Sequence, residues 1–121
     1  SSRRVLFRSQ LILGHLGERI PYDIWRLDHR LQFRHDYPAK QKMGYYLRNN
    51  VHVTTSGHFR TQTLLNAMLE MGADRVMFAV DYPYEQHAPG CTWFDACEIS
   101  ETDRRKIGRE NAIRLFGLDL R

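Results

Sequence analysis

The sequence predicts an α/β fold in which short parallel strands alternate with amphipathic helices. Two observations lead to this prediction. Short runs of apolar, mostly uncharged residues recur along the chain, and longer segments with apolar residues three or four positions apart lie between them. The resulting order is strand, helix, helix, strand, helix, strand, helix, which is typical of a parallel sheet covered by helices.

The first half of the chain opens with a predicted strand at residues 10–13, an apolar run that ends at a glycine. A continuous apolar run is typical of a strand buried on both faces. Pro21 then stands where a helix can begin, and apolar residues continue at helical spacing to Leu31. A loop at residues 36–40 separates this helix from a second helical stretch at residues 42–48.

The second half of the chain repeats this alternation. Residues 51–55 are β-branched and alternating, which predicts a strand. Residues 61–71 form an amphipathic pattern that ends at a glycine, so we expect a helix there. Residues 75–80 predict a third strand, and residues 100–103 resemble a capping box that begins a final helix ending near residue 116.

Composition restricts the classes of partner. The chain has 121 residues, of which 42% are hydrophobic and 26% are charged, as in an ordinary globular domain rather than a disordered one. Its net charge is +4, but the basic residues are scattered among acidic ones instead of forming a stripe, so we expect no nucleic-acid partner. No apolar run approaches the roughly 20 residues that a membrane-spanning helix needs, so we expect no membrane partner.

The two cysteines, Cys91 and Cys97, match neither a disulfide framework nor a zinc-binding spacing. They are best explained as ordinary thiols in a reducing compartment, which predicts a cytoplasmic protein. Residues 1–9 have neither helical nor strand periodicity, and part of this segment reads like a translated sequencing adapter. We therefore expect residues 1–9 to be a non-native or disordered leader and residues 10–121 to be the domain.

Two titratable residues directly follow predicted strands. His15 comes after the first strand and Asp81 after the third. In parallel α/β barrels, functional side chains project from the carboxyl ends of the strands, so this pair is the first candidate for catalysis. A histidine can hold or accept a proton near neutral pH, and an aspartate can ligate a metal or transfer a proton. Each also has a structural alternative: a satisfied buried histidine at position 15, and a capping or loop-closing aspartate at position 81.

Five sequence blocks carry a resemblance to a known family: residues 11–18, 25–30, 51–59, 72–85 and 106–116. In order and spacing they resemble the C-terminal third of the metal-dependent decarboxylase branch of the amidohydrolase superfamily, and the match is most similar to 2,3-dihydroxybenzoate and γ-resorcylate decarboxylases. This resemblance implies that the chain is a C-terminal fragment, about three βα units, of an amidohydrolase-type (β/α)8 barrel, a fold of about 250 residues.

The resemblance also implies roles for individual residues. Asp81 corresponds to a metal ligand that also carries the proton to the aromatic ring, and His15 to the histidine that pairs with it. Glu18 corresponds to an acid that contacts the substrate or orients the histidine, and Arg26 to an arginine near the site. Arg26 is nearly as well explained as an exposed helix arginine. His58 could line the same opening, with an ordinary loop histidine as the alternative.

The implied reaction is nonoxidative decarboxylation of a hydroxybenzoate, a small aromatic carboxylate. One divalent ion would hold the substrate, with zinc favoured and manganese or magnesium as alternatives, and no organic cofactor is implied. The alternatives are hydrolysis of a lactone or ester and a noncatalytic fragment. The resemblance implies a full-length parent that forms a dimer or tetramer. Because the other metal ligands of the family are missing from these residues, we expect the chain alone to be inactive and to expose two sheet edges.

Overall fold

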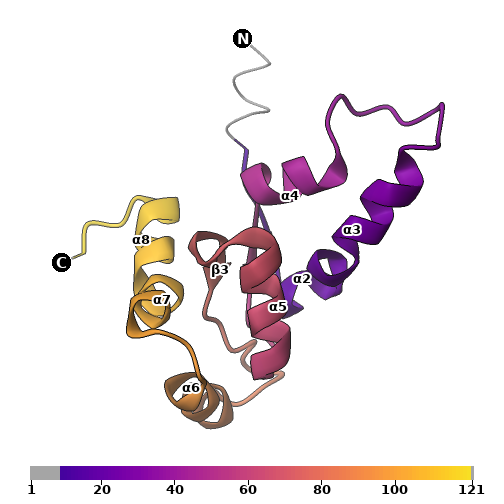
Figure 1. The fold of residues 1–121 in the computed structure, drawn as a ribbon. Coiled ribbons are helices and arrows are strands. Elements are labelled where there is room, and N and C mark those ends of the chain that lie inside the picture. The colour runs from indigo at the N-terminus through magenta and orange to yellow at the C-terminus, as the bar shows by residue number, and fades with distance from the viewer. Residues whose placement is uncertain (1–8, 121) are drawn as a thin grey trace.

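The computed structural model describes residues 9–120, so the predicted leader at residues 1–9 lies outside the described part except for Ser9. The strands β1 (Leu11–Leu13), β2 (Val51–Thr54) and β3 (Val76–Met77) form one sheet in the order β1-β2-β3. Both strand pairs are parallel. The predicted α/β class with parallel strands is therefore confirmed (Figure 1).

The register of the strands gathers three loops at one edge of the sheet. Leu13 lies opposite Val53, and Val53 lies opposite Val76. The carboxyl ends of β1, β2 and β3 consequently point the same way, and the segments that follow them meet there. This arrangement is what brings residues distant in the sequence into one site.

Helices α3 (Ile20–Leu31), α4 (Met43–Asn50) and α5 (Thr61–Met71) match the predicted helical segments closely. Pro21 occupies the first turn of α3, as predicted. Near the other end of α3, the Asp28 carboxylate accepts hydrogen bonds from the backbone N–H groups of Met43 and Gly44, at 2.8 and 3.1 Å. Asp28 therefore caps the first turn of α4 and fixes the angle between the two helices.

Helix α6 (His87–Ala96) was not among the helices predicted from the sequence. The segment contains Pro89 and Gly90 and has only a weak amphipathic pattern, so its sequence does not resemble a helix. Packing accounts for it: a side chain on Gly90 would collide with the ring of Phe59, because an added Cβ would lie 2.9 Å from that ring. The small residue at position 90 thus lets the helix pack closely against the Phe59 ring.

The last helical region is divided into α7 (Glu101–Arg105), the π-helical segment η2 (Lys106–Glu110) and α8 (Asn111–Phe116). The predicted start of this helix at Ser100 is confirmed, because the Ser100 hydroxyl accepts a hydrogen bond from the Asp103 backbone N–H at 3.1 Å. The helix also ends at a left-handed glycine, as predicted.

The third strand is shorter than predicted. Residues 73–75 form a 3-10 turn, η1 (Ala73–Arg75), and β3 ends at Met77. The reason lies at its outer edge, where the Phe78 N–H donates to the Ile107 carbonyl at 2.8 Å. The Asn111 side-chain amide likewise donates to the Val76 carbonyl at 2.8 Å. The expectation of two exposed edges is therefore wrong for β3, whose edge is covered by the C-terminal helical region.

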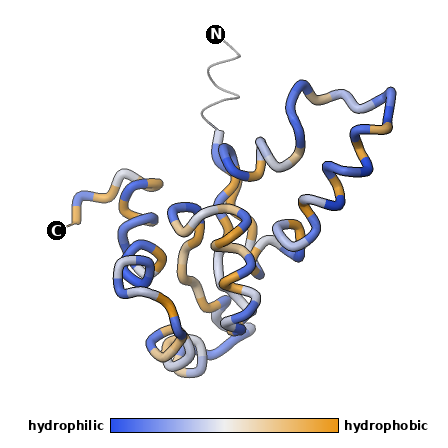
Figure 2. The backbone as a smooth tube through the Cα atoms, in the orientation of Figure 1, coloured by the Kyte–Doolittle hydropathy of each residue, from blue (hydrophilic) through white to orange (hydrophobic). Residues whose placement is uncertain are grey.

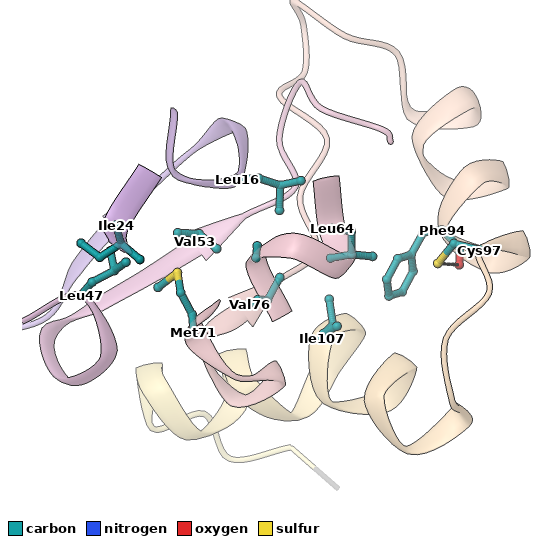
Figure 3. Close-up of a cluster of buried hydrophobic side chains, with 11 residues drawn as sticks. Leu16, Ile24, Leu47, Val53, Leu64, Met71, Val76, Phe94, Cys97 and Ile107 are labelled. Atoms are coloured by element: carbon teal, nitrogen blue, oxygen red, sulfur yellow. Dashed lines mark hydrogen bonds between the residues drawn. The ribbon is translucent and has the colours of Figure 1, made fainter. Parts of the chain in front are cut away.

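The hydrophobic core lies between the sheet and the helices (Figure 3). Hydrophobic residues follow the strands and α5, whereas the connection between α3 and α4 is hydrophilic (Figure 2). The edge strand β1 departs from the prediction of a buried strand: Leu11 is 57% exposed and Ile12 is 40% exposed, because no element of residues 9–120 covers them. The core side chains include Leu16, Ile24, Leu47, Val53, Leu64, Met71, Val76, Phe94 and Ile107.

Candidate active site

A left-handed turn, labelled α2 (His15–Glu18), follows β1 directly. Residues 15–19 all have positive φ angles, between 50° and 82°. For residues other than glycine, this conformation costs about 1–2 kcal/mol each. Two contacts hold the turn: Leu16 is buried in the core, and the Gly17 N–H donates to the Gly14 carbonyl at 2.9 Å. This turn was not predicted from the sequence, although the glycines at positions 14 and 17 signalled unusual backbone geometry.

The turn places the His15 ring between two carboxylates. Its Nδ1 atom is hydrogen-bonded to Glu18 Oε1, and its Nε2 atom lies 3.2 Å from Asp81 Oδ2. The predicted meeting of His15 and Asp81 is thus present. The hydrogen bond to Glu18, followed by the one to Asp81, raises the pKa of His15 above its ordinary value. With 46% of its side chain exposed, His15 is not the buried structural histidine considered as an alternative.

Asp81 is presented to solvent by an unusual backbone conformation. Its φ angle is 85°, and 32% of its side chain is exposed. Gly57, which follows β2, lies against the pair: an added Cβ would be 2.7 Å from Cδ2 of His15 and 3.1 Å from Oδ2 of Asp81. A residue without a side chain is therefore required there, and the sequence analysis did not identify this role for Gly57.

The other candidate residues lie around this pair in different surroundings. Glu18 and the exposed Arg26 line one open cavity of about 540 Å³. His58 lines a separate cavity of about 450 Å³ beside Arg19. The structure therefore joins His15, Glu18 and Asp81 by direct contacts. Arg26 lines the same cavity as Glu18, whereas His58 lines the other cavity.

The donor set for a metal ion is incomplete. Within residues 9–120, no three His, Cys, Asp or Glu side chains are arranged to hold a metal ion. A catalytic divalent ion usually needs three protein ligands. Asp81 is therefore at most one ligand, and residues 9–120 do not by themselves fit a complete metal centre.

Among residues 9–120, no helix has the length and apolar character needed to cross a membrane.

The chain is similar to known decarboxylases in sequence and in fold. The γ-resorcylate decarboxylase of Rhizobium sp. strain MTP-10005 is 52% identical over 115 residues, which cover 93% of this chain and 35% of the relative. The crystal structure of 2,6-dihydroxybenzoate decarboxylase from Rhizobium has a TM-score of 0.87 at 52% identity, covering 92% of this chain and 35% of that one.

A third similar protein is a dihydroxybenzoic acid decarboxylase from Polaromonas sp. JS666, solved with bound manganese and the inhibitor 2-nitroresorcinol. Its TM-score is 0.87 at 49% identity, covering 93% of this chain and 35% of that one. This chain thus spans about a third of the length of these relatives. The family model described as amidohydrolase matches residues 7–118. The chain therefore belongs to the amidohydrolase family.

Proposed function

We propose that the longer protein to which this chain corresponds removes carbon dioxide from a dihydroxybenzoate, with 2,6-dihydroxybenzoate (γ-resorcylate) as the first substrate to test. The observation that carries this proposal is the hydrogen-bonded trio of His15, Glu18 and Asp81 at the carboxyl ends of the strands. The support for the substrate is the 52% identity to a named γ-resorcylate decarboxylase.

The trio suits proton transfer to an aromatic carbon. Decarboxylation replaces the carboxylate of the ring with a proton, so a group near the ring must carry that proton. Because two carboxylates favour its charged form, His15 holds a proton that its Nε2 atom can pass to Asp81 Oδ2, 3.2 Å away. Asp81, which is partly exposed, then delivers the proton to the ring carbon, and carbon dioxide leaves.

Substrate binding is the second part of the proposal. Arg26 provides a positive charge beside Glu18 and suits the carboxylate of an aromatic acid. Glu18 can accept hydrogen bonds from ring hydroxyls. His58 lies in the neighbouring cavity and would contact only a substituent that extends beyond the trio.

The metal is also proposed. The manganese in the Polaromonas relative supports one divalent ion, with Asp81 as one ligand. Zinc, manganese and magnesium are to be compared by adding each ion to metal-free protein. Because residues 9–120 provide an incomplete donor set, we expect the 121-residue chain alone to show no turnover with any of them. A dimer or tetramer and a cytoplasmic location belong to the same proposal.

The decisive experiment uses the longer protein with 2,6-dihydroxybenzoate, measuring carbon dioxide and the decarboxylated phenol. 2,3-Dihydroxybenzoate is the comparison substrate, and a lactone tests for hydrolase activity. We expect carbon dioxide release, reduced by at least about a hundredfold in Asp81→Asn, since positioned acid–base groups contribute at least that much. Lactone opening without carbon dioxide release would favour a hydrolase. Unchanged activity in Asp81→Asn would remove Asp81 from the mechanism.

A further inference from the structure

We propose that Thr55 is a positioning residue that sets Asp81 against His15, an inference that rests on the proposed function. Thr55 acts on this pair through the backbone that leads from β3 to Asp81, as the following contacts indicate.

Beyond the end of the sheet, the Thr55 hydroxyl makes the hydrogen bonds that a neighbouring strand would otherwise make with the backbone of Ala79. The side chain is fully buried, and its Oγ1 atom both accepts from the Ala79 N–H at 3.0 Å and donates to the Ala79 carbonyl at 2.8 Å. Regular strand structure has already ended here, at Thr54 in β2 and at Met77 in β3. The hydroxyl thus continues the connection between the two strands for two more residues, toward Asp81.

Neighbouring residues of the same segment reinforce this connection. On the β3 side, the Thr55 N–H donates to the Met77 carbonyl at 3.0 Å, and the Gly57 N–H donates to the Val80 carbonyl at 3.1 Å. These bonds flank the Ala79 contact on either side. Residues 77–80, which lead to Asp81, are therefore hydrogen-bonded to residues 55–57, the short segment that follows β2.

The opposite side of this segment holds His15. The Ser56 hydroxyl accepts a hydrogen bond from the His15 backbone N–H at 3.3 Å and pairs with the Thr54 hydroxyl at 2.8 Å. The segment 54–57 is consequently hydrogen-bonded both to the backbone of His15 and to the backbone that leads to Asp81. Because the Thr55 hydroxyl bonds the backbone on the Asp81 side, we expect it to set the separation of Asp81 from His15.

The test compares three variants of the longer protein at saturating metal. Thr55→Val keeps the shape and removes the hydroxyl, whereas Thr55→Ser keeps the hydroxyl and removes the methyl group. Thr61→Val is the matched control, because the Thr61 hydroxyl also serves a part-buried structural bond, accepting from Trp93 Nε1 at 3.0 Å, and this bond joins neither His15 nor the segment that leads to Asp81. For each variant, kcat, KM, bound metal and the thermal unfolding midpoint are measured.

We expect Thr55→Val to lower kcat by about tenfold or more with little change in KM, because small displacements of reacting groups slow catalysis strongly. Thr55→Ser should recover most of the parent kcat, and Thr61→Val should lower thermal stability while leaving kcat near the parent value. If Thr55→Val does not fold, Thr55→Cys replaces it, with a weaker hydrogen-bonding group and an expected kcat below that of Thr55→Ser.

Two results would overturn the proposal. One is a parent-like kcat in Thr55→Val while Asp81→Asn abolishes activity. If Thr55→Cys has to replace Thr55→Val, the corresponding result is a kcat equal to that of Thr55→Ser. The other is an equal loss of kcat in Thr55→Val and Thr61→Val that follows their loss of thermal stability, which would show an ordinary structural role. Retention of activity by Asp81→Asn would instead refute the proposed function, so the two failures are distinguishable.

Discussion

Two histidines at opposite ends of the same small sheet occupy opposite electrostatic environments. His15, after β1, is half-exposed between Glu18 and Asp81, and these carboxylates raise its pKa. His52, in the central strand β2, is only 6% exposed, and its Nδ1 atom has no hydrogen-bond partner among the described residues. Burial, followed by the nearby Arg75 and Arg114 guanidinium groups, lowers its pKa.

The backbone around the two histidines differs as well. Near His52, the Arg75 guanidinium donates to the backbone carbonyls of Val51 and Asn49, at 3.1 and 2.9 Å, and so holds the amino ends of the strands together. At the carboxyl ends, the backbone instead adopts positive φ angles and leaves acidic groups open to solvent. The comparison teaches that the titratable side chains available for chemistry lie partly exposed at the carboxyl ends of the strands, whereas the histidine near the amino ends is buried.

The largest expected effect separates the two ends by activity. In the longer protein, His15→Gln should lower kcat by at least about a hundredfold, because the proton held beside Asp81 is lost. His52→Gln, which replaces the histidine at the other end of the sheet, should leave kcat close to the parent value. Steady-state kinetics with 2,6-dihydroxybenzoate checks both. Comparable losses in the two variants would abolish the distinction between the ends.

A glycine substitution tests how closely the carboxyl end is packed. Gly57→Ala and Gly117→Ala both place a side chain at a left-handed position, with φ of 68° and 62°. Each should lower the free energy of unfolding by about 1–2 kcal/mol from backbone strain. Only Gly57→Ala also pushes against His15 and Asp81, so it alone should lower kcat. Chemical denaturation and kinetics together give the answer, and equal kcat values would show that the packing around the pair is loose.

The amino end is expected to control stability at low pH. Because folding lowers the pKa of His52, its contribution is present above its unfolded value near 6.5 and is lost as the pH falls through the folded value. For one proton this loss is at most about 1.4 kcal/mol per pH unit. In His52→Leu this contribution to the pH dependence should disappear. Chemical denaturation at pH 7 and pH 5 measures the free energy of unfolding of both proteins, and an equal pH dependence in the two would contradict the role of His52.

The smallest effect has the opposite sign and belongs to His15. Because folding raises its pKa, its contribution is present below pH 6.5 and is lost as the pH rises through the folded value. Glu18→Gln removes the main cause and should shift the His15 titration downward. The stability change should stay below about 0.5 kcal/mol, since the pair is exposed. NMR titration of the ring measures this shift. Glu101→Gln, which breaks the exposed pair with Arg104, is the control and should leave His15 unchanged.

Much of the architecture could be predicted from local sequence patterns. The helices at residues 20–31 and 61–71 and the Ser100 cap depend on apolar spacing and on one side-chain bond to a nearby backbone group. The meeting of His15 and Asp81 also followed from local pattern, because parallel strands bring the residues after them to one edge. Helix α6 could not be predicted in this way, since its segment contains Pro89 and Gly90 and has only a weak amphipathic pattern.

The sequence by itself determined which residue types follow each strand, and hence which groups are available for chemistry. Only the tertiary structure decided the left-handed turn at His15, the covered edge of β3 and the contacts of Thr55 and Gly57 with the segment before Asp81. The physical reason is that the hydrogen-bond partners at these positions lie about 20 to 40 residues away in the sequence, such as Ala79 for Thr55 and Ser56 for His15. These distant contacts also stabilise the strained backbone conformations. Such distant partners leave no periodic pattern in the local sequence.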